Sequence, residues 1–141
     1  MLNALTSAAG DFAVLLIGLA VGAAWIVAIV APNCSYDRLD ASRADGHVRQ
    51  LLVSASTPIA GLLLASTALA LLGGAWGAGI LAAIAAIGFF TNQWTLAPKK
   101  RGETPPGVRR RRKSQRVVAV SLTLLFGGVA AIAGVLAVLD I

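Results

Sequence analysis

Residues 50–98 read QLLVSASTPIAGLLLASTALALLGGAWGAGILAAIAAIGFFTNQWTLAP, a stretch of 49 residues without a single Asp, Glu, Lys or Arg. One continuous helix of that length would be roughly 74 Å long at about 1.5 Å per residue, whereas the hydrocarbon core of a bilayer is about 30 Å thick. The segment must therefore turn back once. The Gly73-Gly74-Ala75-Trp76-Gly77 sequence supplies small residues for a tight turn and a Trp that suits the headgroup layer, so it predicts two spanning helices joined there.

Two further uncharged stretches lie between Asp11 and Asp37 and between Arg116 and Asp140. Each is long enough for the roughly 20 apolar residues that a spanning helix needs. Hydrophobic residues make up 57% of the 141-residue chain and charged residues only 13%, which is typical of a membrane protein. The sequence predicts one all-α domain over residues 1–141, an integral membrane four-helix bundle of two hairpins. We expect its helices near 12–32, 50–73, 75–96 and 117–139.

The distribution of basic residues predicts the orientation of this bundle. All twelve Lys and Arg lie in the segments 38–49 and 99–116. Short loops rich in Lys and Arg stay on the cytoplasmic side of a membrane. We therefore expect the connections 33–48 and 97–116 to be cytoplasmic loops of a bacterial inner (plasma) membrane protein, with both termini on the opposite, non-cytoplasmic side.

The second connection is strongly basic. Its cationic side chains are expected to contact anionic lipid headgroups or an acidic partner, since each basic side chain near an anionic membrane surface contributes on the order of 1 kcal/mol. The residues concerned are Arg109, Arg110, Arg111, Arg112, Lys113 and Arg116. Because this one loop accounts for most of the high pI, and no aromatic residues are interleaved with it, nucleic-acid binding is not predicted.

Catalytic and metal-binding patterns are not found in the sequence. No carboxylate falls within a predicted span, which excludes proton-coupled transport through an intramembrane acid and general acid–base catalysis by paired carboxylates. His47 is the one histidine and Cys34 the one cysteine, too few ligands for a closed zinc site or for bis-histidine haem. We therefore predict no catalytic residue, no metal and no cofactor.

Three residues are candidates for a ligand or an interhelical contact. Asn92 is expected to hydrogen-bond across helices or to contact a ligand, because an amide within a membrane has no easy partner on its own helix. Trp25 lies only about 5 Å from the predicted bilayer midplane, where it either packs on a neighbouring helix or lines a hydrophobic cavity. His47 is either an interfacial polar residue or a pH-responsive or ligand-contacting one.

Small residues spaced four apart favour close helix packing. They serve either packing within the chain or an interface with a second copy or another membrane protein. Such residues are Gly18 and Gly22, Gly61 and Ala65, Gly74 with Ala78, Ala82 and Ala86, and Gly127 with Ala131.

The sequences Ala31-Pro32 and Ala97-Pro98 each close a predicted helix before a connection of similar length. Either the two hairpins are related by an internal repeat, or Pro simply ends both helices.

Residues 91–98, Thr-Asn-Gln-Trp-Thr-Leu-Ala-Pro, are followed by a basic connection and a last helix, and Pro32 closes the first helix. This layout resembles the small four-helix bacterial membrane proteins of unknown function related to anthrone oxygenases. The resemblance covers most of the chain. It implies an oxygenase-like activity in which Asn92 is the residue that matches the family's pattern.

The function predicted from the residues themselves is that of a structural or accessory subunit, or of a lipid-contacting module, without enzymatic activity. Two alternatives remain open. One is a membrane enzyme acting on a hydrophobic substrate in a cavity around Asn92 and Trp25, and the other is a carrier for an uncharged lipophilic solute along polar residues of the second and fourth helices.

Overall fold

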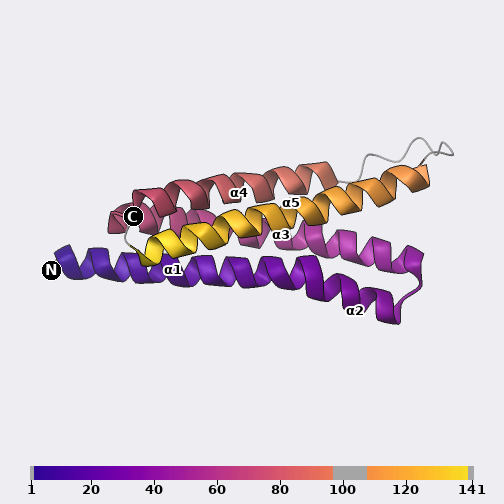
Figure 1. The fold of residues 1–141 in the computed structure, drawn as a ribbon, viewed down its shortest axis with the longest axis horizontal. Helices are drawn as coiled ribbons and strands as arrows, with labels where there is room; N and C mark the ends of the chain where they lie inside the picture. The colour runs from indigo at the N-terminus through magenta and orange to yellow at the C-terminus, as the bar shows by residue number, and fades with distance from the viewer. Residues whose placement is uncertain (1, 97–107, 140–141) are drawn as a thin grey trace.

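A computed structural model describes residues 2–96 and 108–139, and nearly all of them are helical (Figure 1). The elements in chain order are α1 (Leu2–Trp25), the π-helix η1 (Ile26–Val30), α2 (Ala31–Arg38), α3 (Ala41–Gly73), α4 (Trp76–Leu96) and α5 (Val108–Val138). The described chain contains no strand. The all-α class and the four-helix arrangement predicted from the sequence are confirmed.

The first helix is longer than predicted, and Pro32 does not end it. Helical backbone continues from α1 through η1 into α2, as far as Arg38. Pro32 has no backbone N–H, and its ring would clash with the carbonyl four residues earlier in a regular α-helix. The π-helical turn, in which the Ala31 N–H bonds the Ile26 carbonyl, takes up this mismatch and places Pro32 in the first turn of α2. The predicted end of the helix at Pro32 is therefore wrong.

The connection predicted over 33–48 is mostly helix as well. The chain leaves helical geometry only at Leu39 and Asp40, and α3 begins at Ala41 rather than near residue 50. The Ser35 hydroxyl, buried, donates to the Ala31 carbonyl at 2.7 Å, a bond back along its own helix. A loop of sixteen residues is thus replaced by a tight corner between two helix extensions.

The turn between the second and third spans lies where the glycines predicted it. Gly74 ends α3 in the left-handed region at φ 93°, a conformation that costs glycine little, and its N–H is shared between the carbonyls of Ala70 and Leu71. Helix α4 then starts at Trp76, which agrees within one residue with the predicted 75–96 helix.

Helix α5 begins earlier than predicted. Residues 97–107 of the predicted basic loop lie outside the described residues, but the backbone from Val108 onward is helical. The basic run Arg109–Lys113 is therefore on the first turns of a helix and not in a loop, which corrects the prediction of a loop up to residue 116. Arg and Lys are good helix formers, so this run extends the last span instead of interrupting it.

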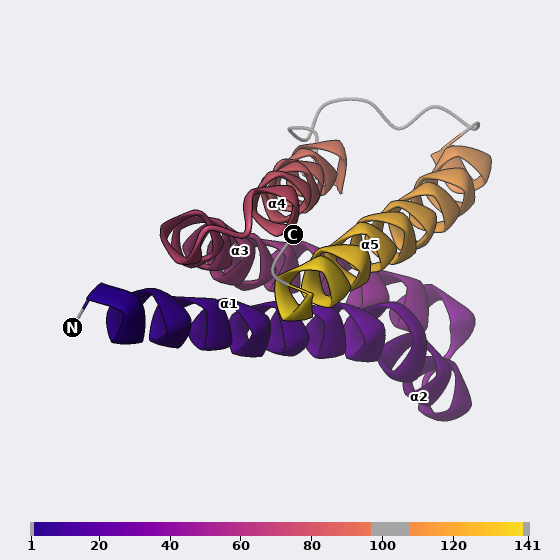
Figure 2. The ribbon, with the colours of Figure 1, turned by 60° about the vertical axis from the view of Figure 1, so that its left-hand side comes forward.

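The four long helices run side by side and alternate in direction (Figure 1). Helix α1 packs on α3 and α5, and α4 also packs on α3 and α5, so that consecutive helices are neighbours around the bundle (Figure 2). Three described helices are long and apolar enough to cross a membrane, over Ala4–Arg38, Arg43–Gly73 and Val117–Val138. The described apolar part of α4 is shorter, Trp76–Asn92.

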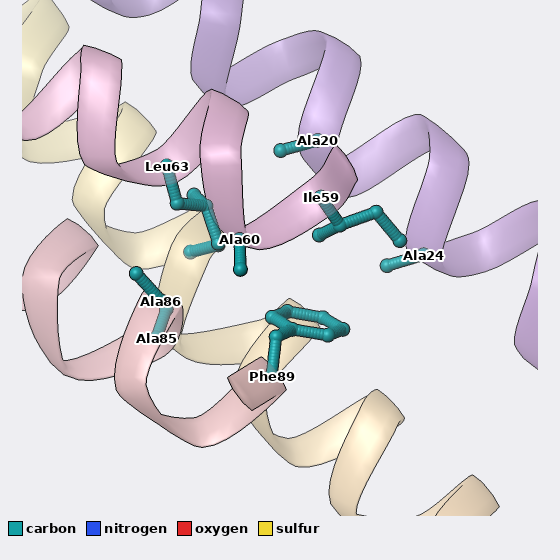
Figure 3. Close-up of a cluster of buried hydrophobic side chains, with 9 residues drawn as sticks. Ala20, Ala24, Ile59, Ala60, Leu63, Ala85, Ala86 and Phe89 are labelled. Carbon is teal, nitrogen blue, oxygen red and sulfur yellow. The ribbon is translucent and has the colours of Figure 1, made fainter. Parts of the chain in front are cut away.

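The interior of the bundle is built largely from alanine. One cluster joins Ala20 and Ala24 of α1 to Ile59 and Leu63 of α3 and to Phe89 of α4 (Figure 3). A second cluster, nearer the Gly74 turn, contains Ala70, Ala78, Ala82 and Ala133. Small side chains let the helix backbones approach closely, and van der Waals contact then stabilises association in lipid.

Two glycines mark close approaches between helices. A Cβ at Gly88 would lie 2.3 Å from ring atoms of Phe126, so the ring of α5 sits directly on the α4 backbone. A Cβ at Gly73 would lie 3.2 Å from the backbone nitrogen of Gly10, where α3 meets α1. Both positions need glycine for packing, in addition to the Gly74 turn.

Candidate functional site

Two charged segments of the chain meet at one end of the bundle. The corner between α2 and α3 and the start of α5 lie together at the right-hand end of Figure 1, whereas the Gly74 turn and the described end of α5 lie at the other. We call the first end the cationic end, defined by residues 33–49 and 108–116. The bundle topology thus brings together two segments that contain nine of the chain's twelve Lys and Arg, whereas Lys99, Lys100 and Arg101 lie outside the described residues.

The α2–α3 corner of the cationic end is tied by a hydrogen bond. The Tyr36 hydroxyl of α2 donates to the Asp45 carboxylate of α3. Arg38, Arg43 and His47 of the same corner are exposed. Asp37 and Asp40 are exposed beside them, and residues 33–49 contain three Asp and three Arg, so the corner presents charges of both signs. The excess of positive charge at the cationic end comes from the start of α5.

The six residues predicted to contact lipid belong to the first turns of α5. The side chains of Arg109, Arg110, Arg111, Arg112, Lys113 and Arg116 lie outside the described part of the structure, so their contacts stay a prediction. The fold places this start of α5 at the same end of the bundle as Arg38, Arg43 and Arg49.

Asn92 is fully buried between α4 and α5. Its Nδ2 donates to Thr123 Oγ1 at 2.9 Å and approaches the Ala119 carbonyl at 3.5 Å, and Thr123 itself donates to that carbonyl at 2.8 Å. The amide therefore makes the contact across helices that was one of its two predicted roles. Ala119 packs with Val48 and Leu52, so this hydrogen bond lies beside the apolar cluster next to the cationic end.

Trp25 points away from the bundle. It is 59% exposed and lies immediately before the π-helical turn. The prediction that its ring packs on a neighbouring helix of the chain is wrong, because the outer face of α1 includes this position. Asn92, by contrast, is buried, so the structure does not bring the two candidates for a hydrophobic substrate site together, and His47 is exposed on the first turns of α3.

The buried hydroxyl groups of α3 bond to their own helix. Ser56 donates to the Leu52 carbonyl at 2.6 Å, and Ser66 and Thr67 both donate to the Leu63 carbonyl at 2.8 Å. These groups are satisfied locally, as is common for Ser and Thr in membrane helices.

An apolar groove that the sequence did not predict runs along the outside of α1 and α5. Its volume is about 400 Å³, and it lies toward the end opposite the cationic one. Its floor is formed where Ile17 meets Gly134, at which a Cβ would lie 3.2 Å from Ile17 Cγ2. The remaining lining residues are Val14, Gly18, Val21, Ala131, Val135, Val138 and Leu139. The Gly18–Gly22 pair on α1 was the one sequence signal near this groove, and small residues of the same spacing occur on other helices too.

Within the described residues, no three His, Cys, Asp or Glu side chains come close enough to hold a metal ion. The described polar groups include the Asn92–Thr123 contact inside the bundle and the exposed charges of the cationic end. Comparison of the chain with protein-family models, with curated proteins and with solved structures finds no match. The resemblance to the proteins related to anthrone oxygenases, and the activity that it implies, therefore stay predictions.

Proposed function

We propose that this chain is an integral protein of a bacterial inner membrane that crosses the bilayer four times and acts as a structural or accessory module whose cationic end binds anionic lipid headgroups. The observation that supports the proposal is the separation of charge along the bundle. Within the described residues, the basic ones lie at one end. Outward-facing large hydrophobic side chains cover much of the rest of α1, α4 and α5.

The dimensions of the helices agree with this proposal. Helix α4 has 21 residues and is thus roughly 31 Å long at about 1.5 Å per residue, which matches a hydrocarbon core about 30 Å thick. Helices α3 and α5 are longer because each extends past the core at the cationic end, and the continuous helix from α1 to α2 extends past it at both ends, since Gly73 at the opposite turn meets Gly10. At the cationic end, α2, the start of α3 and the start of α5 carry the charges. In the proposed orientation these extensions lie at the cytoplasmic headgroup layer.

The lipid-binding part of the proposal is tested with the full-length protein and its own charge-matched control. Arg109–Arg112 are replaced together by Gln in one variant and by Lys in the other, and lipids that co-purify in mild detergent are quantified by mass spectrometry. We expect the wild type and the Lys variant to enrich anionic over zwitterionic lipid, and the Gln variant to lose most of that enrichment, since each basic residue near the headgroups contributes about 1 kcal/mol. Added salt should weaken the enrichment, because it screens exposed charges.

Equal lipid composition in the Gln variant and the wild type would contradict the proposal. Loss of enrichment in the Lys variant as well would show that the guanidinium groups recognise a specific partner, and it would also count against simple lipid attraction.

A further inference from the structure

The outward face of α3 differs from the other outward faces of the bundle. On α1, α4 and α5, exposed large hydrophobic side chains recur throughout, for example Leu15 and Leu19, Ile80, Ile84 and Ile87, or Leu124 and Leu125. On α3, the first exposed large hydrophobic residue is Leu64. The half of α3 that starts at the cationic end therefore offers lipid very little apolar side-chain surface.

Polar and small residues occupy that half instead. At 3.6 residues per turn, the exposed positions fall within an arc of about 100° on one side of the helix. We call this surface the α3 polar face, and it consists of Arg43, His47, Gln50, Ser54, Thr57 and Gly61.

Pro58 lies on the same face and is exposed. It has no N–H to donate to the Ser54 carbonyl, the usual partner one turn earlier. The Ser54 hydroxyl donates to the Leu51 carbonyl at 3.2 Å and keeps its lone pairs as acceptors. A backbone acceptor, the hydroxyl groups of Ser54 and Thr57 and the Gln50 amide thus share one strip that runs from the cationic end into the span. Polar groups that face hydrocarbon are costly, and hydrogen bonding between helices offsets that cost.

We infer that the α3 polar face is the interface for a second copy of this chain, with the two α3 helices parallel about a two-fold axis along the membrane normal. A symmetric pair of copies inserted in the same orientation has its two-fold axis along the membrane normal, and such an interface places each residue near its own counterpart. Gln, Ser and Thr both donate and accept hydrogen bonds, so a strip of them is complementary to itself.

Charge at the end of the strip agrees with self-association. Asp40 and Arg43 are both exposed, and they are one helical turn apart at the start of α3. Across a parallel two-fold pair, each Arg43 lies near its counterpart, and the Asp40 carboxylate of the other copy, one turn away, offsets the repulsion between the two guanidinium groups. Further along, a Cβ at Gly61 would have no atom of the chain within 4 Å, which leaves space for close approach of a second helix backbone.

The inference rests on the membrane insertion proposed above, and it is tested by disulfide crosslinking of the full chain in native membranes. In a Cys34→Ser background, Thr57→Cys places a thiol on the α3 polar face. Leu125→Cys is the matched control, since Leu125 is 59% exposed on α5 and lies at a similar distance from the cationic end. After mild oxidation we expect Thr57→Cys to give a band of twice the chain mass, and Leu125→Cys to give at least fivefold less.

A second pair of variants tests whether the packing surface itself is needed. Gly61→Leu is introduced with Thr57→Cys, and Gly128→Leu is its control on α5. Both glycines are exposed with no atom within 4 Å of a Cβ, so neither change disturbs the bundle itself, which the circular dichroism of the purified variants checks. We expect Gly61→Leu to lower the crosslinked fraction at least fivefold and Gly128→Leu to leave it unchanged.

Absence of the Thr57→Cys dimer, equal crosslinking at Leu125→Cys, a heavier band that contains another protein, or no effect of Gly61→Leu would each overturn the inference. These results bear on the interface alone when the chain stays in the membrane after washing at alkaline pH. Release of the chain by that washing would instead contradict the proposed function, and the inference with it.

Discussion

At the scale of single residues, Asn92 shows how a polar side chain stabilises a bundle that has little other polarity inside. Its amide reaches Thr123 at 2.9 Å from a fully buried position between α4 and α5. Interhelical hydrogen bonds of this kind contribute modestly in membrane proteins, because the separated helices also find partners. The bond therefore specifies how the two helices align more than it supplies their attraction.

A double-mutant cycle of Asn92→Ala and Thr123→Val measures this contribution. We expect a coupling free energy of about 0.6 to 1.7 kcal/mol between the two changes, obtained from the unfolding of the purified protein in mixed micelles. Ser66→Ala with Asn92→Ala is the control pair, because Ser66 bonds the Leu63 carbonyl of its own helix, and it should show no coupling. Additive effects in the first cycle would mean that Asn92 does not act through Thr123.

At the scale of elements, the π-helical turn decides where α2 points. It carries one residue more than an α-helical turn would, which rotates everything after it by about 100° relative to a regular helix. This rotation leaves Tyr36 positioned to bond Asp45 across the α2–α3 corner. Pro32 thus determines the shape of the corner and not the end of the helix.

We expect Pro32→Ala to restore a regular α-helix and to turn Tyr36 away from α3. The readout is the coupling free energy between Tyr36→Phe and Asp45→Asn, obtained from a double-mutant cycle on the unfolding of the purified protein. It should be measurable with Pro32 present and close to zero in the Pro32→Ala background, because the phenol hydroxyl then no longer reaches the carboxylate. Pro58→Ala is the matched control, since it removes a proline from α3 without changing η1. Undiminished coupling after Pro32→Ala would show that the π-turn does not depend on the proline.

At the scale of the whole molecule, the bundle has one charged end and one uncharged turn, and the bilayer is proposed to lie between them. Cys34 is exposed at the charged end, and Trp76 is 66% exposed at the Gly74 turn. In the proposed orientation the two positions lie on opposite sides of the membrane.

Labelling with a membrane-impermeant maleimide tests this arrangement. In intact spheroplasts we expect Cys34 to react only after the inner membrane is permeabilised, whereas Trp76→Cys in a Cys34→Ser background should react in both conditions. The reason is that the positive segments stay on the cytoplasmic side. The opposite pattern would invert the proposed orientation, and labelling of both positions in intact cells would contradict the four crossings.

The α3 polar face shows why the sequence alone did not distinguish the outward faces of the helices from the buried ones. Gly61 and Ala65 have the same spacing as Ala78, Ala82 and Ala86, yet the first pair is exposed and the three alanines are buried. In water, an amphipathic pattern would distinguish these faces. In lipid the outside is as apolar as the inside, so small residues on either face look alike.

The sequence by itself determined the all-helical class, the Gly74 turn, and the confinement of the basic residues to two segments. Charge and hydropathy decide these properties locally, because the transfer of a charged side chain into hydrocarbon is costly wherever it occurs. Only the tertiary structure decided that Pro32 lies within a helix, that α5 starts at Val108, and that Trp25 and Gly61 face outward. These features depend on how four backbones approach one another, and close packing of Gly and Ala leaves no periodic signal of it in the chain.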